Sequence, residues 1–120
     1  MIQIEPTSSS PKVFFDEKTN VFHIEGESYP ENSFEFYKPV FQWFDEVFPT
    51  LDNLEFHLKI SYMNSSSVKC ILDMMTILEE AYENGKNVKI KWFYEPDNSR
   101  SLELAEDFKE DLKLPFEVLT

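Results

Sequence analysis

Glycine and cysteine are scarce in this sequence, and their scarcity excludes several kinds of site. The 120 residues include two glycines, so a glycine-rich loop that cradles phosphates is excluded. With one cysteine, Cys70, no disulfide can form within the chain, which fits a reducing compartment such as the cytoplasm. The first twelve residues lack the basic and apolar regions of a signal peptide. The longest apolar stretches carry charges, so no membrane-spanning segment is predicted.

Positive charge is also scarce. Eleven Lys and Arg residues face 23 Asp and Glu residues, which gives a formal net charge of -12. So acidic a surface repels nucleic-acid phosphates and anionic lipids, and neither is expected as a partner. The charge favours protein partners with basic patches, or it serves solubility.

The residues that usually carry catalysis are few and dispersed. The two histidines, His23 and His57, lie in predicted strands, and no pair of His or Cys residues has metal-ligand spacing. The motifs of hydrolases, nucleotide-binding loops and dinucleotide-binding domains are absent. We therefore expect no catalytic residues, no metal, no cofactor and no enzyme activity. One alternative stays open, an enzyme that uses Cys70 with a histidine.

Apolar and aromatic residues are plentiful, at 42% and 16% of the chain, and support one well-packed domain. We place it at residues 12–120, after a polar segment, residues 1–11, that is either a loose lead-in or a weak edge strand. Alternating or β-branched runs predict strands at 12–17, 21–25, 54–62, 88–94 and 115–119. Helical spacing of apolar residues predicts helices at 33–48, 65–84 and 101–112.

Three of these elements carry more detailed expectations. Pro39 requires that the first helix either kinks or begins near Lys38, since proline is tolerated in a first turn. In the strand at 54–62, strict alternation predicts that Tyr62 faces the core together with Leu54. In the second helix the predicted core-facing positions are 68, 71, 72, 75, 78 and 82.

The order of elements, β-β-α-β-α-β-α-β, defines the expected fold class. Strands that alternate with helices imply crossover connections and a mainly parallel sheet, apart from the opening hairpin. Because two strands keep a polar face, we expect the helices to pack mostly on one face of the sheet.

The most informative segment is Ile60–Lys69, where a strand becomes a helix. Asn64 is followed directly by three serines, and Asn and Ser are favoured N-caps. A helix N-terminus stabilises a nearby anion, so a phosphoserine would be well accommodated there. The same N-terminus, Asn64–Ser67, alternatively suits a sensor of anions or small molecules that works without covalent modification.

Three segments carry a resemblance to a known family. GESYPENS at 26–33, YMNSSSVK at 62–69 and LAEDFKED at 104–111 are similar to the SiaC family of bacterial regulatory phosphoproteins, and the similarity extends from about Val13 to Val118. The resemblance implies a single domain of STAS-like fold, related to anti-sigma-factor antagonists.

The resemblance also implies a function. In that family the hydroxyl residue after the Asn is phosphorylated by a dedicated Ser/Thr kinase and dephosphorylated by a PP2C-like phosphatase. The unphosphorylated form binds and activates a diguanylate cyclase, which promotes biofilm formation. Carried over, Ser65 is the phosphorylated position, with Ser in place of the family's Thr. Asn64 and Ser66 shape the site around it.

A second recognition surface is expected at Tyr29, Pro30, Glu31 and Asn32, where an aromatic ring and a rigid proline lie beside polar side chains. The alternative for this loop is a tight entry into the first helix.

Overall fold

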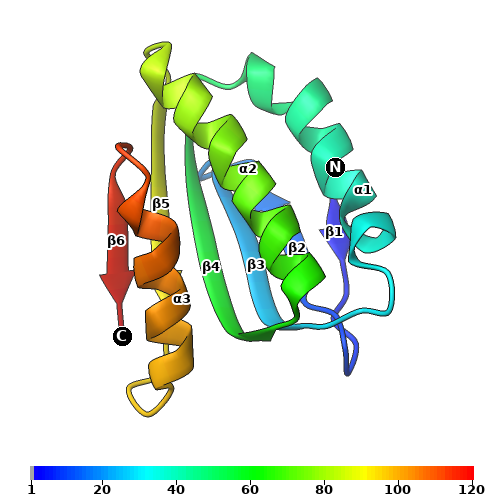
Figure 1. The fold of residues 1–120 in the computed structure, drawn as a ribbon. Helices are drawn as coiled ribbons and strands as arrows, with labels where there is room; N and C mark the ends of the chain where they lie inside the picture. The colour runs from blue at the N-terminus through cyan, green and yellow to red at the C-terminus, as the bar shows by residue number, and fades with distance from the viewer. Residues whose placement is uncertain (1) are drawn as a thin grey trace.

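The structure, a computed structural model, describes residues 2–120 and consists of one sheet and three α-helices (Figure 1). The strands are β1 Gln3–Ile4, β2 Lys12–Asp16, β3 Val21–Ser28, β4 Asn53–Met63, β5 Asn87–Phe93 and β6 Phe116–Leu119. The helices are α1 Ser33–Glu46, α2 Ser65–Glu83 and α3 Ser99–Glu110, and a 3₁₀ turn, η1, covers Phe48–Thr50.

The spatial order of the strands is their order in the sequence. β1 and β2 are antiparallel to their neighbours, whereas β3, β4, β5 and β6 are parallel. Each parallel pair is joined by one helix, as crossover connections require. The expected fold class, a mixed and mainly parallel sheet, is confirmed. Of the two expectations for residues 1–11, the structure shows a short edge strand.

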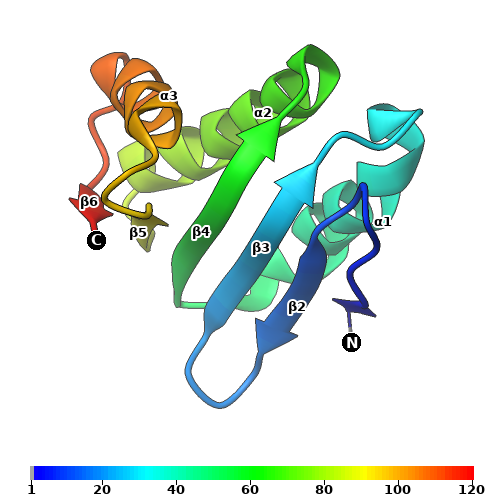
Figure 2. The same ribbon diagram turned by 90° about the horizontal axis from the view of Figure 1, so that it is seen from below.

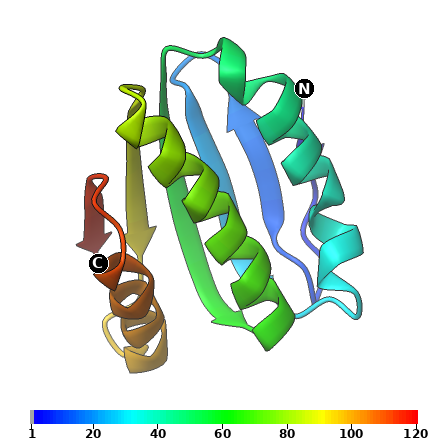
Figure 3. The ribbon, with the colours of Figure 1, turned by 45° about the horizontal axis from the view of Figure 1, so that its top comes forward.

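All three helices lie on the same side of the sheet (Figures 1 and 2). α1 lies toward the β1 edge, α2 crosses the middle, and α3 lies near β6 (Figure 3). The core fills the space between helices and sheet. Its largest fully buried side chains include Trp92, Tyr37, Phe22 and Phe56.

The other face of the sheet has no helix and carries a row of rings. Phe14 stacks on His23 with ring centroids 4.3 Å apart, and His23 meets His57 at 5.3 Å. Phe93 follows at 5.5 Å from His57. Lys12 lies over the Phe14 ring, so a charged head and its aliphatic stem cover an apolar group that would otherwise face water.

Pro39 lies inside α1 and does not mark its beginning. The helix begins at Ser33 with Asn32 as N-cap, whose side chain accepts from the Glu35 N–H. Of the two alternatives for Pro39, a regular helix that begins near Lys38 is therefore wrong. Because Pro39 has no N–H, the carbonyl of Glu35 loses its helical partner, and the exposed position of Pro39 leaves that side of the helix open to water.

The predicted core face of α2 is partly wrong. Leu72 and Tyr82 are 42% and 38% exposed, whereas Cys70 and Met74 are fully buried. The apolar residues of this helix extend around more of its surface than one stripe, so spacing alone did not fix which of them face the sheet. The C-terminal end of α2 lies where it was predicted, within one residue. Gly85, with φ +95°, donates to the Tyr82 carbonyl and Lys86 donates to that of Ala81, which is a Schellman motif.

An irregularity in the β3–β4 pairing changes which face of the sheet the last side chains of β4 lie on. Gly26 pairs with Ile60 but Glu27 pairs with Tyr62, so Ser61 is an extra residue. Beyond it the alternation reverses: Met63 is buried and Tyr62 is 44% exposed. The prediction that Tyr62 faces the core is wrong for this reason. β3 also continues through Gly26 to Ser28, beyond the predicted end of this strand at residue 25.

Candidate functional site

The junction between β4 and α2 is fixed by the side chain of Asn64. Its backbone is extended, with φ −80° and ψ 170°, and its Oδ1 accepts from the Ser67 N–H at 2.9 Å. Its own N–H donates to the carbonyl of Ser28 at the end of β3. This cap satisfies one of the free N–H groups of the helix and leaves those of Ser65 and Ser66 at the N-terminus.

The three serines that follow have different surroundings. Ser65 is exposed, and within residues 2–120 its hydroxyl has no hydrogen-bond partner. Ser66 is half-buried and donates to the Ser33 hydroxyl at 2.7 Å. Ser67 is fully buried. Of the three hydroxyls, that of Ser65 is the one exposed to a phosphate donor, whose phosphorus it could attack.

A chain of buried hydroxyls links the junction to β3 and α1. The Ser67 hydroxyl accepts from that of Ser28 at 2.7 Å and lies 3.0 Å from that of Ser33. The Ser28 hydroxyl also lies 2.6 Å from the phenol of Tyr37, whose pKa is raised by burial. Since hydrogen-bonded groups in a dry interior hold one another in place, the chain fixes the start of α2 relative to two other elements.

The predicted recognition loop lies against this junction. The Pro30 carbonyl accepts from the Asn64 side chain at 3.4 Å. Tyr29 is 40% exposed, and its ring meets the ring of Tyr62 edge-on at 5.7 Å. Glu31 is exposed, while the Asn32 side chain caps α1 by accepting from the Glu35 N–H at 3.1 Å. The structure thus brings the loop and the Asn64–Ser66 segment together, and it gives Asn32 a role in the helix entry.

Sequence reasoning missed the partners of this site. Ser28, Ser33 and Tyr37 had no pattern that marked them as neighbours of Ser67, since hydroxyls at element ends are common. Tyr62 was missed because of the extra residue in β4. Gly26, which pairs with Ile60 directly before the extra residue, could have been a signal, because a glycine inside a strand often marks a bulge, but the predicted strand ended at residue 25.

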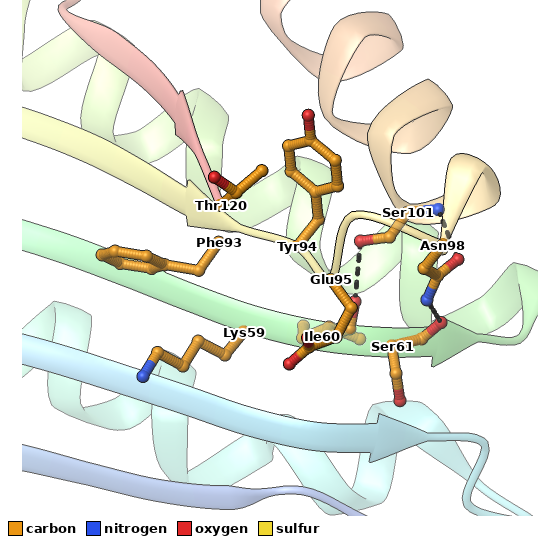
Figure 4. Close-up of a pocket in the computed structure, with 9 residues that line it drawn as sticks. All are labelled: Lys59, Ile60, Ser61, Phe93, Tyr94, Glu95, Asn98, Ser101 and Thr120. Atoms are coloured by element: carbon orange, nitrogen blue, oxygen red, sulfur yellow. Dashed lines mark hydrogen bonds between the residues drawn. The ribbon is translucent and has the colours of Figure 1, made fainter.

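Apart from this junction, a hollow lies at the ends of β4 and β5, beside the N-terminus of α3 (Figure 4). It has a volume of about 270 Å³, and two of its polar side chains, Asn98 and Ser101, have hydrogen-bond partners within the fold. The Ser101 hydroxyl donates to the Ile60 carbonyl and accepts from Trp92 Nε1. The Asn98 side chain caps its own helix and donates to the Ser61 carbonyl. These bonds hold α3 against the sheet and give Asn98 and Ser101 a structural role.

Cys70 and the histidines do not form a site. Cys70 is a fully buried residue of α2, and burial raises the pKa of its thiol. His23 and His57 lie on the helix-free face, so the sheet separates them from Cys70. The alternative of a Cys–His enzyme is therefore excluded.

Residues 2–120 contain neither a metal-binding cluster of side chains nor a membrane-spanning helix. In that part of the chain, no three His, Cys, Asp or Glu side chains are placed to hold a metal ion together. Nor does any of its helices have the length and apolar character needed to cross a bilayer.

The fold and the junction together define a class of protein. It is a single α/β domain that presents one accessible hydroxyl at a helix N-terminus, beside an exposed aromatic loop. The chain belongs to the SiaC family of regulatory phosphoproteins, which it matches over residues 4–120.

Individual relatives agree with this assignment. An uncharacterised protein of Pseudomonas aeruginosa strain UCBPP-PA14 is 36% identical over 98% of this chain and 94% of its own. The crystal structure of the diguanylate cyclase SiaD in complex with its activator SiaC, from Pseudomonas aeruginosa, matches with TM-score 0.94 and 36% identity, covering 99% of this chain and 98% of that one. A structure of SiaC of the same species matches with TM-score 0.90, 35% identity and the same coverage.

Proposed function

We propose that this protein is a phosphorylation-switched adaptor whose unphosphorylated form binds and regulates a diguanylate cyclase. The observation that carries the proposal is the exposed Ser65 hydroxyl at the first position of α2, next to the Tyr29–Asn32 loop. The similarity to a SiaC chain that is bound to the cyclase SiaD supports the choice of partner. Biofilm control through cyclic di-GMP is the output that this partner implies.

The switch works through charge at the docking surface. A phosphate adds ~1.5–2 negative charges and a large hydration shell, which must be removed if the site is covered by a partner. Free N–H groups of Ser65 and Ser66 stabilise the phosphate on the free protein, where it remains hydrated. Phosphorylation therefore stabilises the free form and weakens the complex.

A kinase and a phosphatase complete the proposal. Ser65 is the substrate of a Ser/Thr kinase, and a PP2C-like phosphatase restores the binding form. We place this exchange in the cytoplasm, since the kinase consumes ATP. The Asn64 cap and the Ser66–Ser33 bond keep the segment in one conformation for both enzymes.

Titration calorimetry with a SiaD-type diguanylate cyclase from the same organism tests the adaptor. Wild type and Ser65→Ala should bind alike, and Ser65→Asp should bind at least about tenfold more weakly, which corresponds to ~1.4 kcal/mol. Thr50→Asp is the matched control, because Thr50 is exposed in η1 and remote in sequence from the junction. Equal or tighter binding by Ser65→Asp would reverse the proposed switch.

A separate experiment tests the modification. Protein isolated from native cells should carry one phosphate on Ser65 by peptide mass spectrometry, and Ser65→Ala should carry none. A phosphate on another residue that persists in Ser65→Ala would remove Ser65 from the mechanism and leave the adaptor role standing.

A further inference from the structure

A long groove runs between α2 and α3 on the outer side of the helical layer, where the two helices lie side by side (Figures 1 and 3). Its volume is about 660 Å³. The side chains that line it come from both helices and from the turn after α3: Val68, Leu72, Thr76, Glu79, Glu80, Glu83, Leu104, Asp107, Phe108, Asp111, Leu112 and Lys113.

The floor of the groove is apolar. Val68 and Leu72 line it from α2, four residues apart and so on one helix face. From α3 it is lined by Leu104 and Phe108, and Leu112 in the turn after α3 continues the same interval. Leu72 is 42% exposed although it lies in the middle of a long helix. Converging apolar side chains of this kind, unlike a single exposed leucine, mark a surface that binds something apolar.

One end of the groove is strongly acidic. Five carboxylates line it against the single ammonium of Lys113. Three come from the last part of α2, at 79, 80 and 83, one from the last turn of α3, at 107, and one from its C-cap residue, Asp111. Both helices end there, so their dipoles add to the negative potential. Glu79 accepts from the N–H groups of Lys113 and Leu114, and the other four have no ion pair within residues 2–120.

The opposite end of the groove points toward Ser65. Positions 65, 72 and 76 lie on nearly one line along α2, given 3.6 residues per turn. Ser65 is thus about 10 Å from Leu72 along the helix axis. No acidic side chain lines the groove at this end.

We propose that the groove binds an amphipathic helix of the protein partner, with an apolar stripe on the floor and basic side chains at the acidic end. From residue 68 to residue 83 the α2 wall is about 22 Å long, which matches a helix of about four turns. The charge gradient sets the direction of that helix. Its less basic end then faces Ser65, where a phosphate adds charge and water to the groove mouth. This last point rests on the proposed switch, whereas the groove site does not.

The test uses unphosphorylated protein and two labelled synthetic peptides of about 18 residues with the same leucine stripe. One carries lysines at one end and the other carries glutamates at the same positions. Fluorescence anisotropy should show the lysine peptide binding at least about tenfold more tightly, with affinity that falls as salt is added. Equal binding of the two peptides, or no binding, would overturn the proposal.

Two substitutions on the same helix locate the site. Leu72→Glu should weaken the lysine peptide at least about tenfold. Tyr82→Glu is the matched control, because Tyr82 is similarly exposed, at 38%, and does not line the groove. If Tyr82→Glu weakens binding and Leu72→Glu does not, the peptide lies elsewhere and the proposal fails. No cyclase or phosphate enters this experiment, so its failure would leave the adaptor proposal untouched.

Discussion

Ser65, Ser66 and Ser67 have the same side chain, but their successive positions around α2 give each hydroxyl different surroundings. Ser65 faces water, Ser66 bonds to α1, and Ser67 lies inside the hydroxyl chain with Ser28 and Ser33. Sequence spacing identified Asn64 as the cap, since Asn before a helix is a strong signal. The choice among the serines came from the family resemblance, because burial depends on how three elements meet.

Replacing Ser67 by alanine should destabilise the fold while the same change at Ser65 should not. Ser67→Ala removes a buried hydroxyl that bonds to two others and should lower the free energy of unfolding by about 1–3 kcal/mol. Ser65→Ala, at an exposed position of the same helix turn, should change it by less than about 0.5 kcal/mol. Urea unfolding followed by circular dichroism measures both. Equal effects would mean that the hydroxyl chain contributes no net stability.

At the scale of one element, β4 shows the limit of pattern reasoning. Alternation from Leu54 to Ile60 predicted the buried face correctly. Period-two reasoning assumes an unbroken ladder, and one extra residue inverts every position after it. The inversion exposes Tyr62, which then meets Tyr29 of the predicted recognition loop. The irregularity therefore places an aromatic side chain beside the candidate site.

His23, in the row of rings on the helix-free face, should make the free energy of unfolding depend on pH. The pKa of His23 is lowered from 6.5, first by burial and then by His57 and Lys59, against the opposing charges of Glu25 and Asp16. The unfolded chain thus binds a proton at a pH where the folded chain does not. The contribution of neutral His23 to the free energy of unfolding is fully present above pH 6.5. It is lost as the pH falls from there toward the lower pKa of His23 in the folded state.

Thermal unfolding between pH 8 and pH 5 measures this effect. Glu55 stays ionised over this range, because its pKa is lowered, chiefly by its hydrogen bond to His57. His23→Gln, which does not titrate, should flatten the melting temperature over the same range. A wild-type curve that rises as the pH falls would contradict the assignment.

Pro39 is an opportunity to stabilise α1. An internal proline removes a hydrogen bond and crowds the carbonyl four residues earlier, and Pro39 is exposed, so no core packing depends on it. Pro39→Ala should raise the free energy of unfolding by about 1–2 kcal/mol, less than the full helix penalty of ~3 kcal/mol because proline also restricts the unfolded chain. Gln42→Ala, at an exposed position of the same helix, is the control. A loss of stability in Pro39→Ala would show that the proline ring has a packing role.

For the whole molecule, the net charge of -12 raises the question of whether added phosphate unfolds the domain. We expect the phosphorylated protein to melt within a few degrees of the unmodified one. The helix dipole contributes ~0.3–1 kcal/mol at an exposed N-terminus, and most carboxylates lie beyond the Debye length of ~8 Å at physiological salt. Calorimetry on both forms, with hydrogen exchange across α2, tests this. A large fall in melting temperature with loss of protection in Ser65–Glu83 would mean an order–disorder switch.

The sequence predicted a mixed, mainly parallel sheet and the placement of most elements, because periodicity and connection lengths are local properties. It did not predict the groove between α2 and α3. Helical spacing placed Leu72 in the core. In the structure Leu72 is exposed in the groove, because α2 and α3 do not close over it. Surfaces that two elements build together are set by packing, which no single segment encodes.

Since strand order equals sequence order, the sheet can be assembled in the direction of synthesis. Each parallel strand, as it leaves the ribosome, finds its neighbour already in place, and the growing edge moves from β3 to β4, β5 and β6. An unpaired edge is prone to join another chain. From the end of β3 to the end of β4 the chain adds about 35 residues, which takes roughly 2–7 s at usual elongation rates. The edge that could aggregate is thus covered again within seconds, at every step of the way to the short final strand.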